Sequence, residues 1–216
     1  MKFAVILSGC GVYDGAEIHE ATLALLAIEK NGGSYKIFAP DVQQHHVVNH
    51  ITGDEMKETR NVLIESARIA RGNIEPLDNY NPADFDALIL PGGFGVAKNL
   101  CTYAFDGPTF KVDKVVEKAI KDTNAAGKVI GALCIAPVMI VKILGEVDVT
   151  IGNDKTTAAH IEKIGGVHVE SANGEVVIDN TNRIVSTPCY MLDAKITDIA
   201  IGADNVVKAI IEMTEE

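Results

Sequence analysis

Cys134 has the strongest chemical context of any residue in this chain. It lies between an apolar run, 129–133, and a segment that starts at Ile135 and carries Pro137 in its first turn. The run is typical of a buried parallel strand, and proline fits the first turn of a helix, so the pattern predicts a sharp strand-to-helix turn at Cys134. A helix N-terminus favours the thiolate, which makes this cysteine a candidate nucleophile. The alternative is a buried cysteine that packs as a small hydrophobic residue.

A cysteine nucleophile needs a group that handles its proton and N–H donors for the oxyanion that develops. Glu17 and Glu20 are three residues apart, on one face near the start of a predicted helix, with His19 on a different face. Gly92 and Gly93 follow a predicted strand directly, and their backbone N–H groups can approach a substrate oxygen. A simple Pro-Gly-Gly turn is the alternative. A carboxylate beside a thiol raises the thiol pKa unless the carboxylate is protonated, so we expect the pair to titrate as one unit.

No motif indicates a metal or a cofactor. The cysteines at positions 10, 101, 134 and 189 are scattered and form no C-x-x-C pair. His45, His46 and His50 lie in a polar segment, 41–58, and imidazole groups can bind a metal. We favour the alternative that this segment is a surface loop without a metal site. The glycines at positions 9 and 11 lack the third glycine of a dinucleotide fingerprint, and no P-loop is present. We predict no metal and no cofactor.

Charge and hydropathy exclude further classes of function. The chain of 216 residues has 19 basic and 30 acidic residues, a net charge of −11, which disfavours nucleic acid and anionic membranes as partners. The first apolar run is too short for a signal peptide, and no stretch approaches the roughly 20 apolar residues of a membrane span. Together with the unpaired cysteines, these features predict a cytoplasmic protein with reduced thiols.

The rest of the chain alternates strands and helices. Strands are predicted near 2–7, 35–40, 86–90, 129–133 and 148–151, and helices near 16–30, 60–71, 112–126, 137–144, 156–164 and 193–213. The runs 175–179 and 183–187 flank a turn and predict a hairpin. This alternation predicts an α/β fold with a mostly parallel sheet in a single domain, 1–216, with the chemical segments at one sheet edge.

The chain also resembles a known family. The segments V-I-L-S-G-C-G-V-Y-D-G-A-E-I-H-E, D-A-L-I-L-P-G-G-F-G-V-A-K-N-L, C-I-A-P and T-P-C-Y-M-L are similar to the ElbB-like (enhancing lycopene biosynthesis) family, in the PfpI-like branch of the class I glutamine amidotransferase-like superfamily. The resemblance implies a flavodoxin-like three-layer sandwich, a cysteine nucleophile and a homodimer. It also implies glyoxalase activity, or a related deglycase activity, without a cofactor.

Carried over by position, the resemblance gives roles to particular residues. Cys134 matches the superfamily nucleophile, and Glu20 matches the carboxylate that faces it. Gly93 and the N–H of Ile135 match the oxyanion-hole donors. Many superfamily members have histidine directly after the cysteine, where this chain has Ile135. This departure weakens an amidase or peptidase interpretation and favours aldehyde chemistry.

We therefore predict an enzyme that converts small 2-oxoaldehydes, such as glyoxal, into hydroxy acids. Cys134 would add to the aldehyde, and Gly93 and Ile135 would hold the oxyanion. Glu20, alone or together with His19 or Glu17, would move a proton between the two carbons. Gly92, Glu17 and His19 are candidate substrate-binding neighbours. Two alternatives remain: a redox-sensing or chaperone-like stress protein in which Cys134 is oxidised, and a binding protein linked to isoprenoid metabolism.

Overall fold

The computed structural model describes residues 1–215, and these residues contain a seven-stranded sheet that is parallel except at one edge. The strand order is β3-β2-β1-β4-β5-β9-β8, and β8 pairs with β9 in the antiparallel direction. In chain order the strands are β1 (Lys2–Ile6), β2 (Ser34–Ala39), β3 (Ile74–Pro76), β4 (Ala87–Leu90), β5 (Val129–Leu133), β8 (Val177–Asp179) and β9 (Ile184–Thr187).

The central strands are apolar on both faces. Along β1, Phe3 and Val5 point into one hydrophobic core, and Ala4 and Ile6 point into the other. A parallel strand with helices on both of its faces needs such a continuous apolar run, which is why β1, β4 and β5 could be recognised from sequence.

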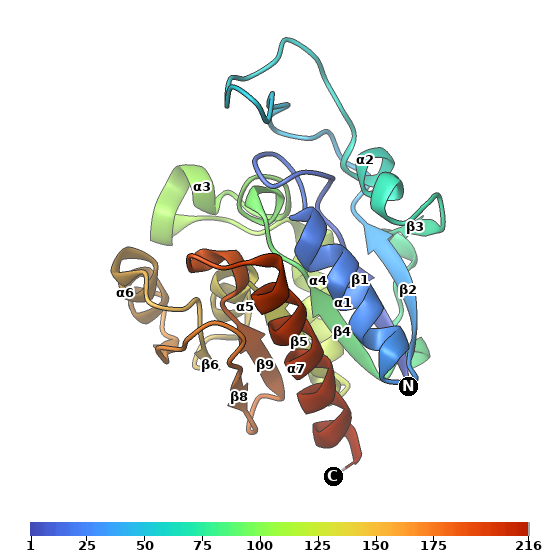
Figure 1. Cartoon of the computed structure of the whole chain (residues 1–216), viewed down its shortest axis with the longest axis vertical. Coiled ribbons are helices and arrows are strands. Elements are labelled where there is room, and N and C mark those ends of the chain that lie inside the picture. The colour runs from blue at the N-terminus through green and yellow to red at the C-terminus, as the bar shows by residue number, and fades with distance from the viewer. Residues whose placement is uncertain (216) are drawn as a thin grey trace.

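Helices cover both faces of the sheet (Figure 1). In chain order they are α1 (Ile18–Lys30), α2 (Val62–Ile69), α3 (Tyr103–Asp106), α4 (Lys114–Ala125), α5 (Ala136–Leu144), α6 (Lys155–Lys163) and α7 (Ile196–Glu215). Helices α1 and α7 pack against each other on one face with α2 beside them, while α4 and α5 cover the other face and α6 packs on α5. Within residues 1–215, no helix is both long enough and apolar enough to cross a membrane.

Short elements complete the structure. A second sheet pairs β6 (Asp148–Val149) with β7 (Val167–His168) in parallel, beside β8. The segment η3 (Val96–Leu100) is one turn of π-helix, and η1 (Leu77–Asn79), η2 (Pro82–Asp84), η4 (Gly107–Thr109) and η5 (Cys189–Met191) are short 3₁₀ helices. The predicted fold, a flavodoxin-like α/β sandwich with a mostly parallel sheet and a hairpin at its edge, is confirmed. The strand β3 was not predicted.

Helix α1 begins later than its sequence pattern predicts. Asp14 and Glu17 have the spacing of a capping box, which places the helix start near Ala16. In the structure Glu17 is itself the N-cap, and its Oε2 accepts the N–H of Glu20 at 2.7 Å. The Asp14 carboxylate instead accepts the N–H of Val48, at 2.7 Å. A long-range contact therefore displaced the local capping pattern.

Candidate active site

The chain turns from β5 into α5 at Cys134, as the sequence pattern predicts. Cys134 has φ of +60°, and its N–H donates to the carbonyl of Thr187 at 2.9 Å, which continues the pairing of β5 with β9. A left-handed backbone costs a residue other than glycine about 1 kcal/mol. Such strain at a conformation fixed by its surroundings is typical of functional residues, and here it exposes the sulfur at the end of a buried strand.

Gly92 packs closely against Cys134, where a side chain would not fit. A Cβ added at Gly92 would lie 2.5 Å from the Cβ of Cys134 and 2.9 Å from Oε2 of Glu20. The Gly92 N–H donates to that same oxygen at 2.9 Å, and its carbonyl accepts the N–H of Glu17 at 3.0 Å. The two backbone bonds hold the start of α1 against the end of β4. The Gly92-Gly93 pair is thus a close-packed junction, and a simple turn would not require these glycines.

Two backbone N–H groups face the sulfur of Cys134. They belong to Gly93, whose φ of +95° few other residues adopt, and to Ile135, the N-cap residue of α5. Hydrogen bonds from both groups lower the pKa of the Cys134 thiol. The structure thus brings the two predicted donors to the predicted nucleophile.

Glu20 lies behind the thiol and is fully buried. Burial and, after it, the charge of Glu17 raise its pKa, the hydrogen bonds from Cys134 and from the Gly92 and Tyr190 N–H groups lower it, and the net result is a pKa of about 7. Burial also raises the pKa of the Cys134 thiol well above its usual range, and the Glu20 charge adds to that shift. The Glu20 charge therefore disfavours the Cys134 thiolate, whereas the hydrogen bond from the thiol favours the Glu20 carboxylate, so the protonation states of the two groups are linked.

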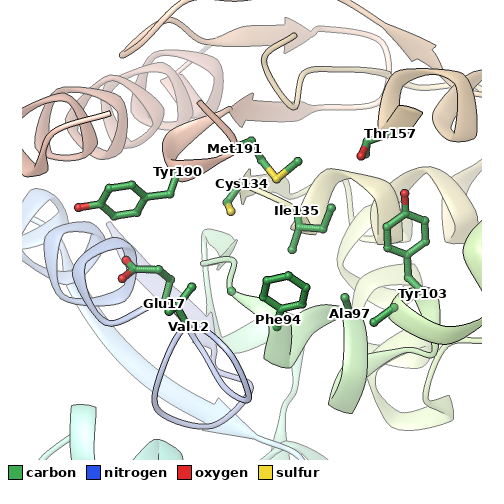
Figure 2. Close-up of a pocket in the computed structure, with 12 residues that line it drawn as sticks. Val12, Glu17, Phe94, Ala97, Tyr103, Cys134, Ile135, Thr157, Tyr190 and Met191 are labelled. Atoms are coloured by element: carbon green, nitrogen blue, oxygen red, sulfur yellow. The ribbon is translucent and has the colours of Figure 1, made fainter. Parts of the chain in front are cut away.

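A cavity of about 290 Å³ opens beside the thiol (Figure 2). Cys134 is 7% exposed, at its wall. The side chains and backbone that line the cavity are those of Val12, Glu17, Gly93, Phe94, Ala97, Tyr103, Ala104, Cys134, Ile135, Thr157, Tyr190 and Met191. The lining is mostly apolar, and the residues with polar side chains in it are Glu17, Tyr103, Thr157 and Tyr190.

The predicted site residues fall into three positions relative to this cavity. Cys134, Gly93, Ile135 and Glu17 line it, whereas Glu20 and Gly92 do not. His19 is exposed on α1, where its Nδ1 lies 2.8 Å from the Tyr190 hydroxyl and 4.0 Å from Oε1 of Glu17. The seven residues lie in or beside this region, and of the two glutamates it is Glu17 that lines the cavity.

Several lining residues were missed from sequence. Tyr190 and Met191 belong to η5, directly after β9, which lies next to β5 in the sheet. The rule that ligands bind beyond the carboxyl ends of strands could have found them, because the β9 run was recognised. Tyr103 and Thr157 come from α3 and α6, and no motif marks them.

Cys189 is a buried neighbour of Cys134. Burial, with the nearby charge of Glu20, raises the pKa of the Cys189 thiol well above its usual range. Its φ of +44° is also left-handed. Cys101 is different: its thiol donates to the carbonyl of Val96 in the opposite core, and burial raises its pKa to about 12.

The three loop histidines lie away from the thiol. The rings of His45 and His46 pack on Phe105, with centroid distances of 4.2 and 5.6 Å. His50 stacks on Tyr13 at 4.9 Å, and its Nε2 lies 3.2 Å from the Tyr13 N–H. In the part of the chain described, residues 1–215, no three His, Cys, Asp or Glu side chains are grouped to hold a metal ion.

Known proteins resemble this chain along nearly its whole length. The glutamine amidotransferase-like class 1 domain-containing protein 3, mitochondrial, of Homo sapiens is 45% identical, and the alignment covers 99% of this chain and 83% of that protein. The ES1 protein, mitochondrial, of Danio rerio is 33% identical, over 99% of this chain and 86% of its own. No family model matches the chain.

Solved structures extend the likeness. An isoprenoid biosynthesis protein with an amidotransferase-like domain from Ehrlichia chaffeensis is 37% identical, with a TM-score of 0.93 and 99% of both chains covered. Glyoxalase III of Candida albicans has a TM-score of 0.63 at 17% identity, over 99% of this chain and 97% of that one. At that identity the likeness shows the shared fold alone.

The names of the relatives contradict one prediction. Both the human and the zebrafish proteins are named mitochondrial, so the cytoplasmic location predicted from the sequence is wrong. That prediction used the scattered, unpaired cysteines. Free thiols are compatible with any reducing compartment, so they do not identify the cytosol.

Proposed function

This chain belongs to the family of ES1 and glutamine amidotransferase-like class 1 domain proteins, and we propose that it is a cofactor-independent, glyoxalase-like enzyme. Its substrate would be a 2-oxoaldehyde and its product the corresponding 2-hydroxy acid. One observation carries the proposal: a strained cysteine at a helix N-terminus, with two N–H donors and a buried carboxyl group of pKa about 7, lines a cavity.

The reaction is balanced within the substrate and water. The Cys134 sulfur adds to the aldehyde carbon, and the oxygen of the hemithioacetal lies against the N–H groups of Gly93 and Ile135. A proton leaves the former aldehyde carbon and another is added to the neighbouring carbon, whose oxygen takes up the proton released by the attacking thiol; this gives a 2-hydroxy thioester. Water then cleaves the thioester and releases the acid and the thiol. The first carbon is oxidised and the second reduced, so no external oxidant is needed.

The two glutamates have separate positions and therefore separate roles. Glu20 is buried behind the sulfur and does not line the cavity, so it exchanges a proton with Cys134. A pKa of about 7 suits this exchange, because the carboxyl group can both take and return a proton near neutral pH. Glu17 does line the cavity, so it is the carboxylate that can reach the substrate carbons. We therefore assign the proton transfer between the carbons to Glu17, which was expected from the sequence only as a partner of Glu20 in this step.

The residue after the nucleophile favours aldehydes over amides. Ile135 provides no imidazole beside the thiol, and no histidine is among the residues that line the cavity. Amide hydrolysis needs an acid that protonates the departing amine. An aldehyde adduct has no departing amine, so the present set of groups is sufficient for it.

The test uses metal-free protein with glyoxal and with methylglyoxal. The parent protein should consume both and produce glycolate and lactate, and lactate formed in deuterated water should carry deuterium on its second carbon. Cys134→Ser should lower the rate by at least about a hundredfold. Cys101→Ser is the matched control, because Cys101 is equally buried but belongs to the opposite core.

An unchanged rate in Cys134→Ser would refute the proposal, provided that thermal melting shows the variant to be folded. Lactate without deuterium would leave Cys134 as the nucleophile but would remove the role given to Glu17, since a direct hydride shift exchanges no proton with water.

A further inference from the structure

We infer that the substrate is an uncharged 2-oxoaldehyde whose second carbon carries an apolar group of about the size of a phenyl ring. This inference rests on the proposed function and specifies its substrate class. Glyoxal itself would then be a poor, incomplete occupant of the site.

The size of the cavity is the first argument. At about 30 Å³ for each water-sized group, 290 Å³ holds roughly ten such groups. Glyoxal has only four non-hydrogen atoms. The cavity is close to the lower end of the range typical for sites that enclose organic ligands. Most of its space thus lies beyond the reach of a two-carbon substrate held at Cys134.

The lining of the remaining space is the second argument. Figure 2 shows the Ile135 side chain between Cys134 and Tyr103, with the ring of Phe94 alongside. Ala97 and Ala104 line the same cavity and leave room because their side chains are small. An apolar group bound there would be removed from water along its length. Each methylene group that is buried increases the binding affinity roughly fourfold.

Ile135 has a second consequence here. The same residue that leaves the thiol without an imidazole also supplies apolar surface to the cavity next to the reacting sulfur. The departure from the superfamily pattern thus changes the shape and polarity of the substrate site as well as its proton chemistry.

Charge is the third argument. No lysine or arginine is among the residues that line the cavity, and the ionisable carboxyl group there belongs to Glu17. At the far end, the Tyr103 hydroxyl already bonds Nδ1 of His160 at 2.9 Å. A terminal phosphate or carboxylate would find no cation and would be repelled by Glu17, so the substituent is uncharged.

The first measurement compares kcat/KM for phenylglyoxal and glyoxal, from initial rates. Phenylglyoxal should be preferred at least tenfold. Ala104→Phe should remove most of that preference, because Ala104 lines the cavity but is exposed on α3, where a larger side chain can be accommodated. Ala83→Phe is the matched control: Ala83 is also exposed but lies in η2, before the start of β4, and does not line the cavity.

The second measurement does not depend on turnover. Calorimetry compares 2-hydroxyacetophenone with hydroxyacetone, which has methyl in place of phenyl; neither has an aldehyde to form the adduct. The phenyl compound should bind at least tenfold more tightly to the parent and to Ala83→Phe, and Ala104→Phe should abolish the difference.

The two measurements distinguish a failure of the proposed function from a failure of the inference about the substrate. If neither aldehyde is consumed but the calorimetric preference holds and depends on Ala104, the proposed function is wrong and the apolar ligand class stands. Equal affinities for the two ketones, or a preference that Ala104→Phe leaves intact, would overturn the inference.

Discussion

Two loops that follow parallel strands carry reactive side chains and invite comparison. One is the elbow around Cys134, after β5, and the other is the segment 41–61, after β2, with its three histidines. Both contain residue types that attack carbonyl groups or bind metals, and both lie beyond the carboxyl end of a strand, where ligand sites form in α/β proteins. The sequence pattern favours the elbow, because no metal-binding motif accompanies the three histidines.

The two loops differ in the groups that surround their reactive atoms. At the elbow, two N–H groups and a fully buried carboxyl group are directed at one sulfur. In the loop, His45 is exposed and rests on Phe105, and His50 is exposed and stacks on Tyr13. The comparison shows that burial and converging donors make a site, because they shift the pKa of a group and fix its direction.

The largest expected difference comes from a glycine that packs against the elbow, Gly92 after β4, and a glycine within the histidine loop, Gly53. Gly92→Ala should destabilise the protein by at least about 3 kcal/mol, because the new methyl group would overlap the Cβ of Cys134, an atom that cannot rotate away. It should also abolish aldehyde turnover. Gly53→Ala should cost only about 1 kcal/mol, since Gly53 has φ of +79° and a Cβ there meets nothing within 4 Å. Urea unfolding and initial rates measure both.

Equal destabilisation by the two alanines would contradict the close packing described at the elbow. The Gly53 variant serves as the control, because it measures the free-energy cost of placing alanine in a left-handed backbone conformation without any steric overlap.

The next effect concerns Glu20 and depends on pH. Its folded-state pKa of about 7 lies above the usual value of 4.5, so its contribution to stability is fully present below about pH 4.5 and is lost as pH rises through 7. A difference of about 2.5 pKa units corresponds to about 3 kcal/mol as an upper bound. Glu20→Gln has no such charge to bury, so its stability relative to the parent should increase from pH 5 to pH 8 by up to that amount.

Glu55→Gln, in the 41–61 loop, is the matched control, because Glu55 is exposed. Its free energy of unfolding relative to the parent should change little over the same pH interval. A parallel pH dependence in the two variants would mean that Glu20 is not a buried, neutralised carboxyl group in the folded protein.

Much of the fold and the centre of the site could be predicted from the sequence. Apolar runs such as 129–133 identify strands that are covered on both faces, and a cysteine between such a run and a helix start identifies the elbow. The assignment of Gly93 and Ile135 to Cys134 is implied by the resemblance to the superfamily, and the structure gives its physical basis, since β4 and β5 are neighbours in the sheet. The other features are local in the chain.

The remaining features depend on contacts that no local pattern records. Helical spacing places Glu17 and Glu20 on one face, but it does not say that Glu17 reaches the cavity while Glu20 stays behind the sulfur. That distinction is set by the bond from the Glu17 N–H to Gly92, which fixes where α1 begins. Likewise, Tyr103 and Thr157 reach the cavity only because α3 and α6 pack beside it.

The smallest expected effect lies in the histidine loop. The double substitution of His45→Gln and His46→Gln removes two ring contacts to Phe105, which are exposed and should contribute about 0.5 kcal/mol. Aldehyde turnover should stay within about twofold, because no converging donors act on these rings. Added Zn²⁺ should shift the thermal midpoint of the parent and of the variant equally. A tenfold loss of turnover, or a Zn²⁺ shift confined to the parent, would place this loop in the function and remove the contrast with the elbow.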